Sequence, residues 1–407
     1  MYVKRHIEEA VLRRAKTKGA IVVTGARQVG KTTLIEHIMP KLPKVTLDDL
    51  PTRRSAKESP STFFNITPPP IFVDEVQYAP EIFHYIKIAL DNSKKKGEFF
   101  LTGSQSFELM KNVSESLAGR AGILELHGLS MREINRESWN EPFVPTLEYL
   151  LGRSKTKTNK LSIPEIWSQV HRGTMPELVF AKDYDWSEFY ADYVKTYIER
   201  DVRKLTQVAD EGSFNTFMAV CAAMSGQLLN LSSLASDVGI SVPTAKRWLS
   251  ILKTSGLIYL LKPYSNNAIN RAVKTPKLHF MDIGLASYLT RWMTAETLAI
   301  GANNGSFFES YVVSEIVKSY ANAGKEASLY FLRDGNRREI DLLIYENNIL
   351  YPIEIKIKPE PSERDIKHFS MLNDLKNITV GAGGIICMAN ELHQLSEKAF
   401  IIPLEMI

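Results

Sequence analysis

One segment near the start of the chain constrains the fold more than any other. Gly25–Thr32 reads GARQVGKT and follows the apolar run Ile21–Val23. It matches the pattern G-x-x-x-x-G-K-[ST], which requires a strand before it and a helix after it. Gly25 and Gly30 allow the backbone to curl so that its N–H groups converge on phosphate oxygens. The segment therefore predicts a phosphate-binding loop within an α/β fold.

Each part of this loop has an expected task. The Lys31 ammonium would reach the β- and γ-phosphates of ATP, and the Thr32 hydroxyl would hold Mg²⁺. The helix that starts here adds its positive N-terminal end. ATP and Mg²⁺ are therefore the predicted cofactors. The expected nucleotide contacts are Gly25, Ala26, Arg27, Gln28, Val29, Gly30, Lys31, Thr32, Thr33 and Asp74.

Two later apolar runs end in polar groups that would complete the site. In IFVDEVQ, Asp74 would anchor Mg²⁺ as a metal ligand together with Thr32. The next residue, Glu75, is the predicted catalytic base that polarises the attacking water. FFLTGSQ ends in Ser104 and Gln105, which a parallel sheet would place beside the γ-phosphate. We interpret Ser104 as a phosphate sensor, although a simple turn explains the same residues.

The pattern along the chain predicts an α/β fold in several parts. Short apolar runs alternate with helical patterns at the start, which is typical of a parallel sheet covered on both faces. A polar stretch, KTKTNK, is interpreted as a loop or linker. We expect a P-loop α/β core at 1–150, a helical lid or linker at 151–212, a winged helix at 213–265 and a second α/β domain at 266–407.

The expected winged helix rests on a short turn between two amphipathic helices. The turn lies at Val238–Ser241, and the helix after it carries Lys246, Arg247 and Lys253. A basic helix after such a turn suits the major groove of DNA. Its apolar side chains are explained by packing alone. Winged helices also contact proteins or serve as the lid of an ATPase, and the sequence leaves these alternatives open.

A second group of charged residues lies near the end of the chain, in REIDLLIYENNILYPIEIKIK. Glu339 and Asp341 are two residues apart and share one face of a strand, as do Glu354 and Lys356 on the next strand. A hairpin would bring these faces together. Carboxylates that converge on Mg²⁺ beside a lysine form the arrangement of a metal-dependent nuclease. Two half-buried strands with a charged outer face explain the same alternation.

The order of GARQVGKT, IFVDEVQ, FFLTGS and SLAGRAGILELHGLSMRE resembles the AAA+ superfamily. Within it, HRGTMPEL, YIERDV and LHFMDIGLASYL are similar to a bacterial and archaeal group of ATPases with a C-terminal domain of unknown function. The similarity spans nearly the whole chain. It implies ATP hydrolysis, and it implies a catalytic arginine finger or sensor at Arg120, after the LAG triplet. An ordinary ion pair explains Arg120 equally well.

The C-terminal residues resemble the PD-(D/E)xK restriction-endonuclease-like fold. The resemblance implies a third metal ligand on the preceding helix, Glu309, beside Asp341 and Glu354, with Lys356 as the nuclease lysine. The proline of the pattern is missing, and Ile340 precedes the aspartate. Even a true match of fold does not establish cutting, because fold and activity separate readily.

Composition narrows the remaining classes. A formal charge of +4 permits a nucleic-acid partner without requiring one. Two cysteines, no signal peptide and no apolar stretch of about 20 residues predict a cytoplasmic protein without a membrane span. We expect ATP hydrolysis coupled to the nuclease-like domain, with DNA and further copies of the chain as partners. The alternative is an ATP-gated module that binds nucleic acid or protein without cutting.

Overall fold

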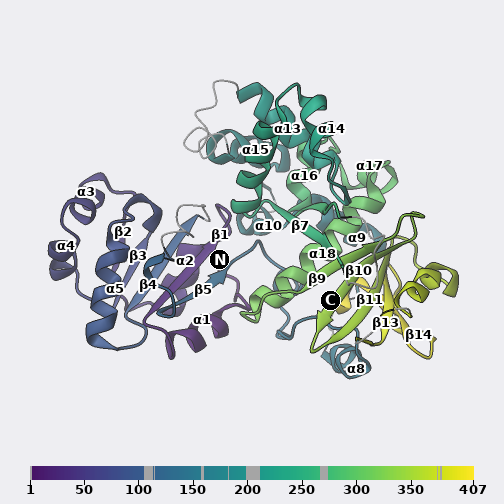
Figure 1. Ribbon diagram of the computed structural model, residues 1–407, viewed down its shortest axis with the longest axis horizontal. Coiled ribbons are helices and arrows are strands. Elements are labelled where there is room, and N and C mark those ends of the chain that lie inside the picture. The colour runs from purple at the N-terminus through teal and green to yellow at the C-terminus, as the bar shows by residue number, and fades with distance from the viewer. Residues whose placement is uncertain are drawn as a thin grey trace. The chain divides into compact units, whose positions relative to one another are not determined.

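The computed structural model describes residues 2–104, 113, 115–156, 160–181, 183–198, 211–265, 274–373, 375 and 378–407. Figure 1 shows the helices and strands, coloured along the chain. The chain divides into two compact units, which are described separately here. The first comprises Met1–Leu129 with the short segments Thr254–Gly256 and Ala321–Lys325, and the second comprises the rest.

The first unit is built on a five-stranded parallel sheet in the order β2-β3-β4-β1-β5. Its strands are β1 (Ala20–Gly25), β2 (Lys44–Thr46), β3 (Ile71–Asp74), β4 (Phe99–Ser104) and β5 (Ala121–Glu125). The predicted α/β class and parallel sheet are confirmed. β5 alternates between buried and half-buried residues because it lies at the sheet edge, so it shows no continuous apolar run.

Helices cover this sheet and bury its apolar residues. They are α1 (Glu8–Ala15), α2 (Lys31–Ile38), α3 (Leu50–Glu58), α4 (Pro60–Ile66) and α5 (Ile82–Ser93), with a 3₁₀ turn η1 (Val76–Tyr78). Val73 and Leu101 share one buried cluster with Phe64 of α4 and Phe83 of α5. Phe100 points to the opposite face and is also fully buried. Burial on both faces explains the continuous apolar runs Ile71–Val73 of β3 and Phe99–Leu101 of β4.

The second unit is rich in helices. They are α7 (Met131–Ile134), α8 (Leu147–Thr156), α9 (Ile163–Arg172), α10 (Pro176–Phe180), α11 (Trp186–Tyr193), the π-helical turn η2 (Val194–Ile198), α13 (Glu211–Ala223), α14 (Leu231–Val238), α15 (Val242–Thr254), α16 (Ile283–Leu289), α17 (Ala295–Ile300), α18 (Asn304–Asn322), and the 3₁₀ segments η3 (Glu363–Leu372) and η4 (Leu404–Met406). α8 occupies part of the stretch expected to be a loop. Its buried side chains Tyr149, Leu150 and Arg153 recur at helical spacing, which the polar tail of the segment obscured.

A mixed sheet forms the other part of this unit, in the order β14-β15-β13-β11-β10-β9-β7-β8-β6 with β12 beside β11. Its strands are β6 (Gln227–Leu228), β7 (Ile258–Pro263), β8 (Lys277–Phe280), β9 (Leu329–Arg333), β10 (Glu339–Glu346), β11 (Ile349–Lys356), β12 (Thr379–Val380), β13 (Gly383–Cys387), β14 (His393–Ser396) and β15 (Ala399–Pro403). β7 pairs with β8 on one side and β9 on the other. Hydrogen-bonded strands therefore continue across the boundary expected between residues 265 and 266.

Candidate functional site

The loop between β1 and α2 has a backbone that only glycine fits at two positions. Gly25 has a φ of 149°, and a Cβ there would come within 2.0 Å of the Leu126 carbonyl oxygen. Gly30 has a φ of 92° and stands at the N-terminus of α2. Both values lie in the region that L-residues with a side chain rarely adopt. The tight loop that the motif predicts is therefore present.

Two side chains that follow Gly30 lie close to the loop and to β3. The Lys31 ammonium is buried and donates to the carbonyl oxygens of Gly25 at 3.1 Å and Ala26 at 2.7 Å. The Thr32 hydroxyl donates to the two carboxylate oxygens of Asp74, at 3.0 and 3.1 Å. The structure thus brings together the lysine, the hydroxyl and the carboxylate expected to bind phosphate and Mg²⁺.

Thr102 is a neighbour of Asp74 that the sequence reasoning missed. Its hydroxyl, from the adjacent strand β4, donates to the Asp74 carboxylate and is fully buried. A hydroxyl inside the otherwise apolar run FFL-T was the signal that could have found it. Backbone pairing places Ser104 beside Gly25. The Ser104 side chain and Gln105 lie outside the described residues.

Glu75 has an unusual backbone conformation. It directly follows β3 and has a φ of 58° and a ψ of 45°, in the left-handed region. Its carboxylate accepts a hydrogen bond from the Gln77 side chain. A left-handed glutamate costs conformational free energy, of the order of 1–3 kcal/mol, and such residues cluster at functional sites. This conformation sets Glu75 apart from an ordinary solvated acid at a strand end.

Arg5 is a second residue that the sequence reasoning missed. Its guanidinium is buried and donates to the carbonyl oxygens of Val29 in the loop and His127 after β5, each at 2.8 Å. It therefore connects the loop to the chain beyond the edge strand. Because Arg5 lies far from the motif in a charged N-terminal segment, no local pattern indicated this contact.

Arg120 lies at the N-terminal end of the parallel strands, whereas the P-loop lies at their C-terminal end. It is therefore badly placed to contact the phosphate site of its own chain. It precedes β5, and its neighbour Ala121 pairs with Ala20 at the start of β1, whereas the loop follows Gly25 at the other end. At about 3.3 Å per residue, the length of β1 separates the two ends of the strand by about 15–20 Å. The guanidinium instead pairs with Asp91, at 2.5 and 2.9 Å. This position does not favour an in-chain sensor role, and a finger role across a subunit boundary stays a prediction.

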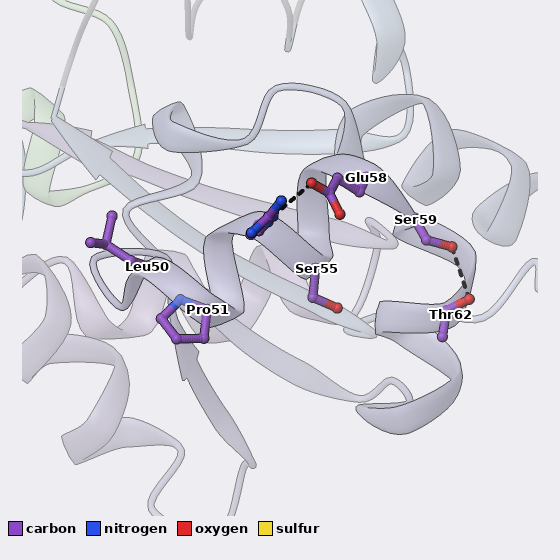
Figure 2. A pocket seen from close by; sticks show the side chains of 7 residues that line it. Leu50, Pro51, Ser55, Glu58, Ser59 and Thr62 are labelled. Carbon is purple, nitrogen blue, oxygen red and sulfur yellow. Dashed lines mark hydrogen bonds and ion pairs between the residues drawn. The ribbon is translucent and has the colours of Figure 1, made fainter.

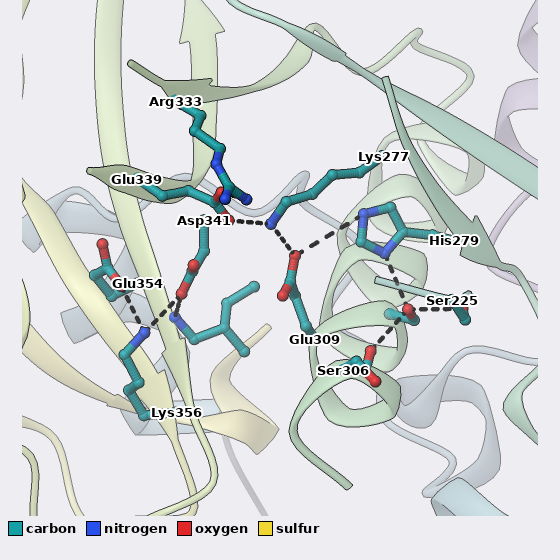
Figure 3. A network of polar contacts seen from close by, with 12 residues as sticks. Ser225, Lys277, His279, Ser306, Glu309, Arg333, Glu339, Asp341, Glu354 and Lys356 are labelled. Atoms are coloured by element: carbon teal, nitrogen blue, oxygen red, sulfur yellow. Dashed lines mark hydrogen bonds and ion pairs between the residues drawn. The ribbon is translucent and has the colours of Figure 1, made fainter. Parts of the chain in front are cut away.

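The C-terminal strands bring together three of the residues expected there (Figure 3). The Lys356 ammonium on β11 lies 2.9 Å from Asp341 on β10 and 2.6 Å from Glu354. The Asp341 carboxylate also accepts the backbone N–H of Ile355, at 2.9 Å. The expected grouping of two carboxylates and a lysine on neighbouring strands is thus present.

Lys277, a second lysine that the sequence reasoning missed, contacts the two remaining acidic residues, Glu309 and Glu339. The ammonium of Lys277 on β8 lies 2.8 Å from Glu309 on α18 and 2.6 Å from Glu339 on β10. The Lys277 side chain is only 3% exposed. Arg333 also pairs with Glu339, at 3.0 Å. No sequence motif singled out Lys277, because its strand lies far from β10 along the chain.

Burial and neighbouring charge shift the pKa values of this cluster in different directions. Burial raises the pKa of Glu309 to about 7, although Lys277 opposes the shift. Burial, followed by the charge of Asp341, raises the pKa of Glu354 to about 9. Burial also opposes ionisation of Asp341, but the charges of Lys356 and Lys277 lower its pKa overall. The pair Asp341 and Glu354 therefore carries one carboxylate and one carboxyl at neutral pH.

The expected metal ligands Glu309, Asp341 and Glu354 do not form a shared site. Within the described ranges, no three His, Cys, Asp or Glu residues come together as metal ligands would. Glu309 is held by Lys277, whereas Asp341 and Glu354 are held by Lys356. The donor set thus presents ammonium-bound carboxylates, which do not fit a divalent cation as arranged. This differs from the expectation drawn from the sequence.

An open groove of about 630 Å³ lies on α3 and α4 (Figure 2). An ion pair between Arg54 and Glu58, at 2.8 Å, crosses one side of it. Its lining residues are Leu50, Pro51, Arg54, Ser55, Glu58, Ser59 and Thr62. None of these residues belongs to the predicted site.

Over the part of the chain that is described, no helix has the length and apolar character needed to cross a membrane.

Two solved structures are similar to part of this chain. At 13% identity, a Walker-type ATPase of Pyrococcus abyssi covers 71% of this chain and 96% of its own, with a TM-score of 0.46. AMPPCP-bound DnaA from Aquifex aeolicus, also 13% identical, covers 61% and 85%, with a TM-score of 0.28.

Two relatives match most or all of the chain. The uncharacterized protein Rv2008c of Mycobacterium tuberculosis is 26% identical over 410 residues, covering 100% of this chain and 85% of its own. The uncharacterized protein MJ1544 of Methanocaldococcus jannaschii is 21% identical over 379 residues, covering 87% and 79%. The chain is therefore similar to bacterial and archaeal proteins over most of their length.

Three protein-family models match successive parts of the chain. Residues 163–296 match a domain of unknown function (DUF8612), and residues 304–407 match another (DUF4143). Residues 17–135 match the family described as AAA domain. This last match covers the parallel sheet and the glycine loop between β1 and α2. The first unit therefore contains a P-loop ATPase domain of the AAA type.

Proposed function

We propose that the protein binds ATP with Mg²⁺ at the P-loop and hydrolyses it. The observation that carries the proposal is the contact between the Thr32 hydroxyl and the Asp74 carboxylate, two oxygen donors from different elements. Mg²⁺ prefers oxygen ligands, and these two would hold it. The ion would supply positive charge to the phosphate oxygens as the γ-phosphoryl group is transferred.

The other expected residues divide the remaining tasks. The backbone N–H groups of 25–33 would surround the phosphates, and the Lys31 ammonium would turn from the loop carbonyls to the β- and γ-phosphates. Glu75 would accept a proton from the attacking water, for which its strained position directly after Asp74 is favourable. Ser104 stays our proposed sensor of the γ-phosphate.

Release of phosphate from ATP by the purified full-length protein tests this function. We expect turnover in the presence of Mg²⁺ and its loss when EDTA removes the ion, because the phosphate charge is then not neutralised. Binding of a fluorescent ATP analogue, measured in parallel, separates loss of binding from loss of hydrolysis. Failure to bind ATP, or turnover that is unaffected by EDTA, would contradict the proposal.

Arg5 offers a test of how the loop is positioned. Its guanidinium holds the Val29 carbonyl, and in a trans peptide the N–H of Gly30 points the opposite way. Fixing the carbonyl therefore fixes the direction of a phosphate-binding N–H. We expect Arg5→Met to raise the Kd for ATP about tenfold, which corresponds to about 1.4 kcal/mol. Titration with the fluorescent analogue measures this change.

The matched control for Arg5 is Lys4→Met. Lys4 is exposed and is the preceding residue, so its replacement removes a cation without touching the loop. The thermal unfolding midpoint of both variants is measured, since a general loss of structure would also weaken binding. An Arg5→Met protein that unfolds at the wild-type temperature and binds ATP as tightly as wild type would exclude the positioning role.

We further propose that the ATPase acts on or with DNA through the second unit. Helices α13, α14 and α15, followed by the antiparallel pair β7–β8, support a winged helix. Lys246, Arg247 and Lys253 are exposed on α15, which suits phosphate contacts. The same phosphate-release assay with single- and double-stranded DNA tests this partner. Unchanged turnover and no DNA binding at low salt would favour a protein partner instead.

The C-terminal strands support a restriction-endonuclease-like fold in the second unit. Helix α18 precedes β9, β10 and β11, and Asp341, Glu354 and Lys356 meet on neighbouring strands. We propose that the nucleotide state governs this part of the chain, while cutting does not follow from its fold. Assembly of several copies, with Arg120 acting on a neighbouring active site, belongs to the same proposal. Its expected sign is a rate per molecule that rises with protein concentration.

A further inference from the structure

The charged cluster of the second unit contains its own cations. Seven side chains take part: Glu309, Glu339, Asp341, Glu354, Lys277, Arg333 and Lys356. Four acidic side chains thus face three cationic side chains. A divalent cation added to this set would make the positive charge exceed the negative charge. In Figure 3 the Lys277 ammonium lies between the carboxylates of two elements, α18 and β10.

We propose that the Lys277 ammonium is a built-in cation that takes the place of a divalent metal in this cluster. Its contacts, 2.8 Å to Glu309 and 2.6 Å to Glu339, hold two carboxylates from different elements as a bound metal would. The wild-type cluster therefore takes no Mg²⁺ or Mn²⁺. This inference is independent of ATP hydrolysis, which concerns the other unit.

Lys277 cannot readily give up this position. β8 is paired with β6 on one side and β7 on the other, so the backbone beneath Lys277 is fixed. The side chain is only 3% exposed. A metal ion that took Glu309 and Glu339 would leave the ammonium buried without its carboxylate partners, and an uncompensated buried charge is strongly unfavourable.

The lysine also has a structural consequence for the sheet. Through Glu309, it meets a chain of polar contacts in which the His279 Nδ1 lies 3.0 Å from the Ser310 hydroxyl. Ser310 in turn lies 2.9 Å from the hydroxyl of Ser225, in the turn after α13. These contacts join that turn to β8 and α18. The cluster thus connects the helical part of the unit to its C-terminal strands. Because Lys277 is part of the chain, this connection does not depend on the metal concentration.

Mn²⁺ binding by the full-length, nucleotide-free protein tests the proposal. Free Mn²⁺ is followed by electron paramagnetic resonance, and the thermal unfolding midpoint is followed in the same titration. We expect wild type and Asp341→Ala to bind the same number of Mn²⁺ ions, since any ion held at the P-loop does not depend on Asp341. We expect Lys277→Met to gain one site, because Glu309 and Glu339 then lose the ammonium that lies between them.

The gained site should raise the unfolding midpoint of Lys277→Met by about 5 °C at Mn²⁺ concentrations near 100 times its Kd. This gain should vanish in Lys277→Met combined with Glu339→Ala, which removes one of the two carboxylates that Lys277 contacts. The matched control is Lys262→Met, which removes an exposed lysine from the neighbouring strand β7 and should gain no site. Lys277→Arg keeps the charge and should also gain none.

Two results would overturn the inference. One is a Mn²⁺ site in the wild-type protein that Asp341→Ala removes, because the cluster would then hold metal with Lys277 in place. The other is a folded Lys277→Met protein that gains no site. Should Lys277→Met fail to fold, the comparison of wild type with Asp341→Ala still decides whether the natural cluster takes a metal.

Discussion

Lys31→Ala is expected to lower ATP turnover by about a hundredfold to a thousandfold and to weaken ATP binding. The substitution removes the ammonium that lies at the P-loop, 2.7 Å from the Ala26 carbonyl. Lys31 is the one lysine in the loop sequence Gly25–Thr32. Steady-state phosphate release and titration with a fluorescent ATP analogue measure the two effects.

The control for Lys31 is Lys41→Ala, which removes an exposed lysine from the same unit. It should leave both turnover and binding within about twofold of wild type, as surface changes usually do. Comparable thermal unfolding midpoints for the two variants would show that the domain is intact. Wild-type turnover in Lys31→Ala would remove the P-loop as the site of hydrolysis.

Glu75→Gln should separate binding from chemistry. The amide has nearly the shape of the carboxylate but cannot accept a proton from water, so turnover is expected to fall by about 10²- to 10⁴-fold. The Kd for ATP should change little, because the lysine, the Thr32 hydroxyl and the Asp74 carboxylate are untouched. Single-turnover hydrolysis and equilibrium binding on the same preparation distinguish the two quantities.

Glu81→Gln is the matched control for Glu75, since it makes the same chemical change at an exposed position just before α5. It should hydrolyse ATP at the wild-type rate. Normal hydrolysis by Glu75→Gln would exclude Glu75 as the base. Loss of binding along with hydrolysis would show instead that Glu75, with its left-handed backbone, supports the structure of the loop.

The local pattern of the chain was enough to predict the α/β core and the P-loop. Gly25 and Gly30 occupy backbone conformations that other residues rarely adopt, so the motif itself specifies the turn. The apolar runs predicted β1, β3 and β4, because strands buried on both faces have few polar positions. Asp74 contacts Thr32 because the C-terminal ends of the parallel strands lie at the same end of the sheet as the loop.

Strand direction and sheet order settled what the local pattern left open. Arg120 lies just before β5, at the opposite end of the strands from the P-loop, although its motif suggested a place beside the phosphate. Thr102 reaches Asp74 only because β4 lies next to β3. Neither relation can be deduced from spacing along the chain, since both depend on which strands are neighbours.

Arg5 and Lys277 show the same limit more strongly. Arg5 supports the P-loop from a segment before the first strand, and Lys277 reaches the C-terminal carboxylates from the hairpin strand β8. In the sequence each is one of 50 lysines and arginines, and no local pattern marks it as buried. The motifs alone determined the nucleotide loop, because its geometry is local. Tertiary structure decided which cations are buried against it and against the carboxylates, because burial and pairing join segments that are distant in the chain.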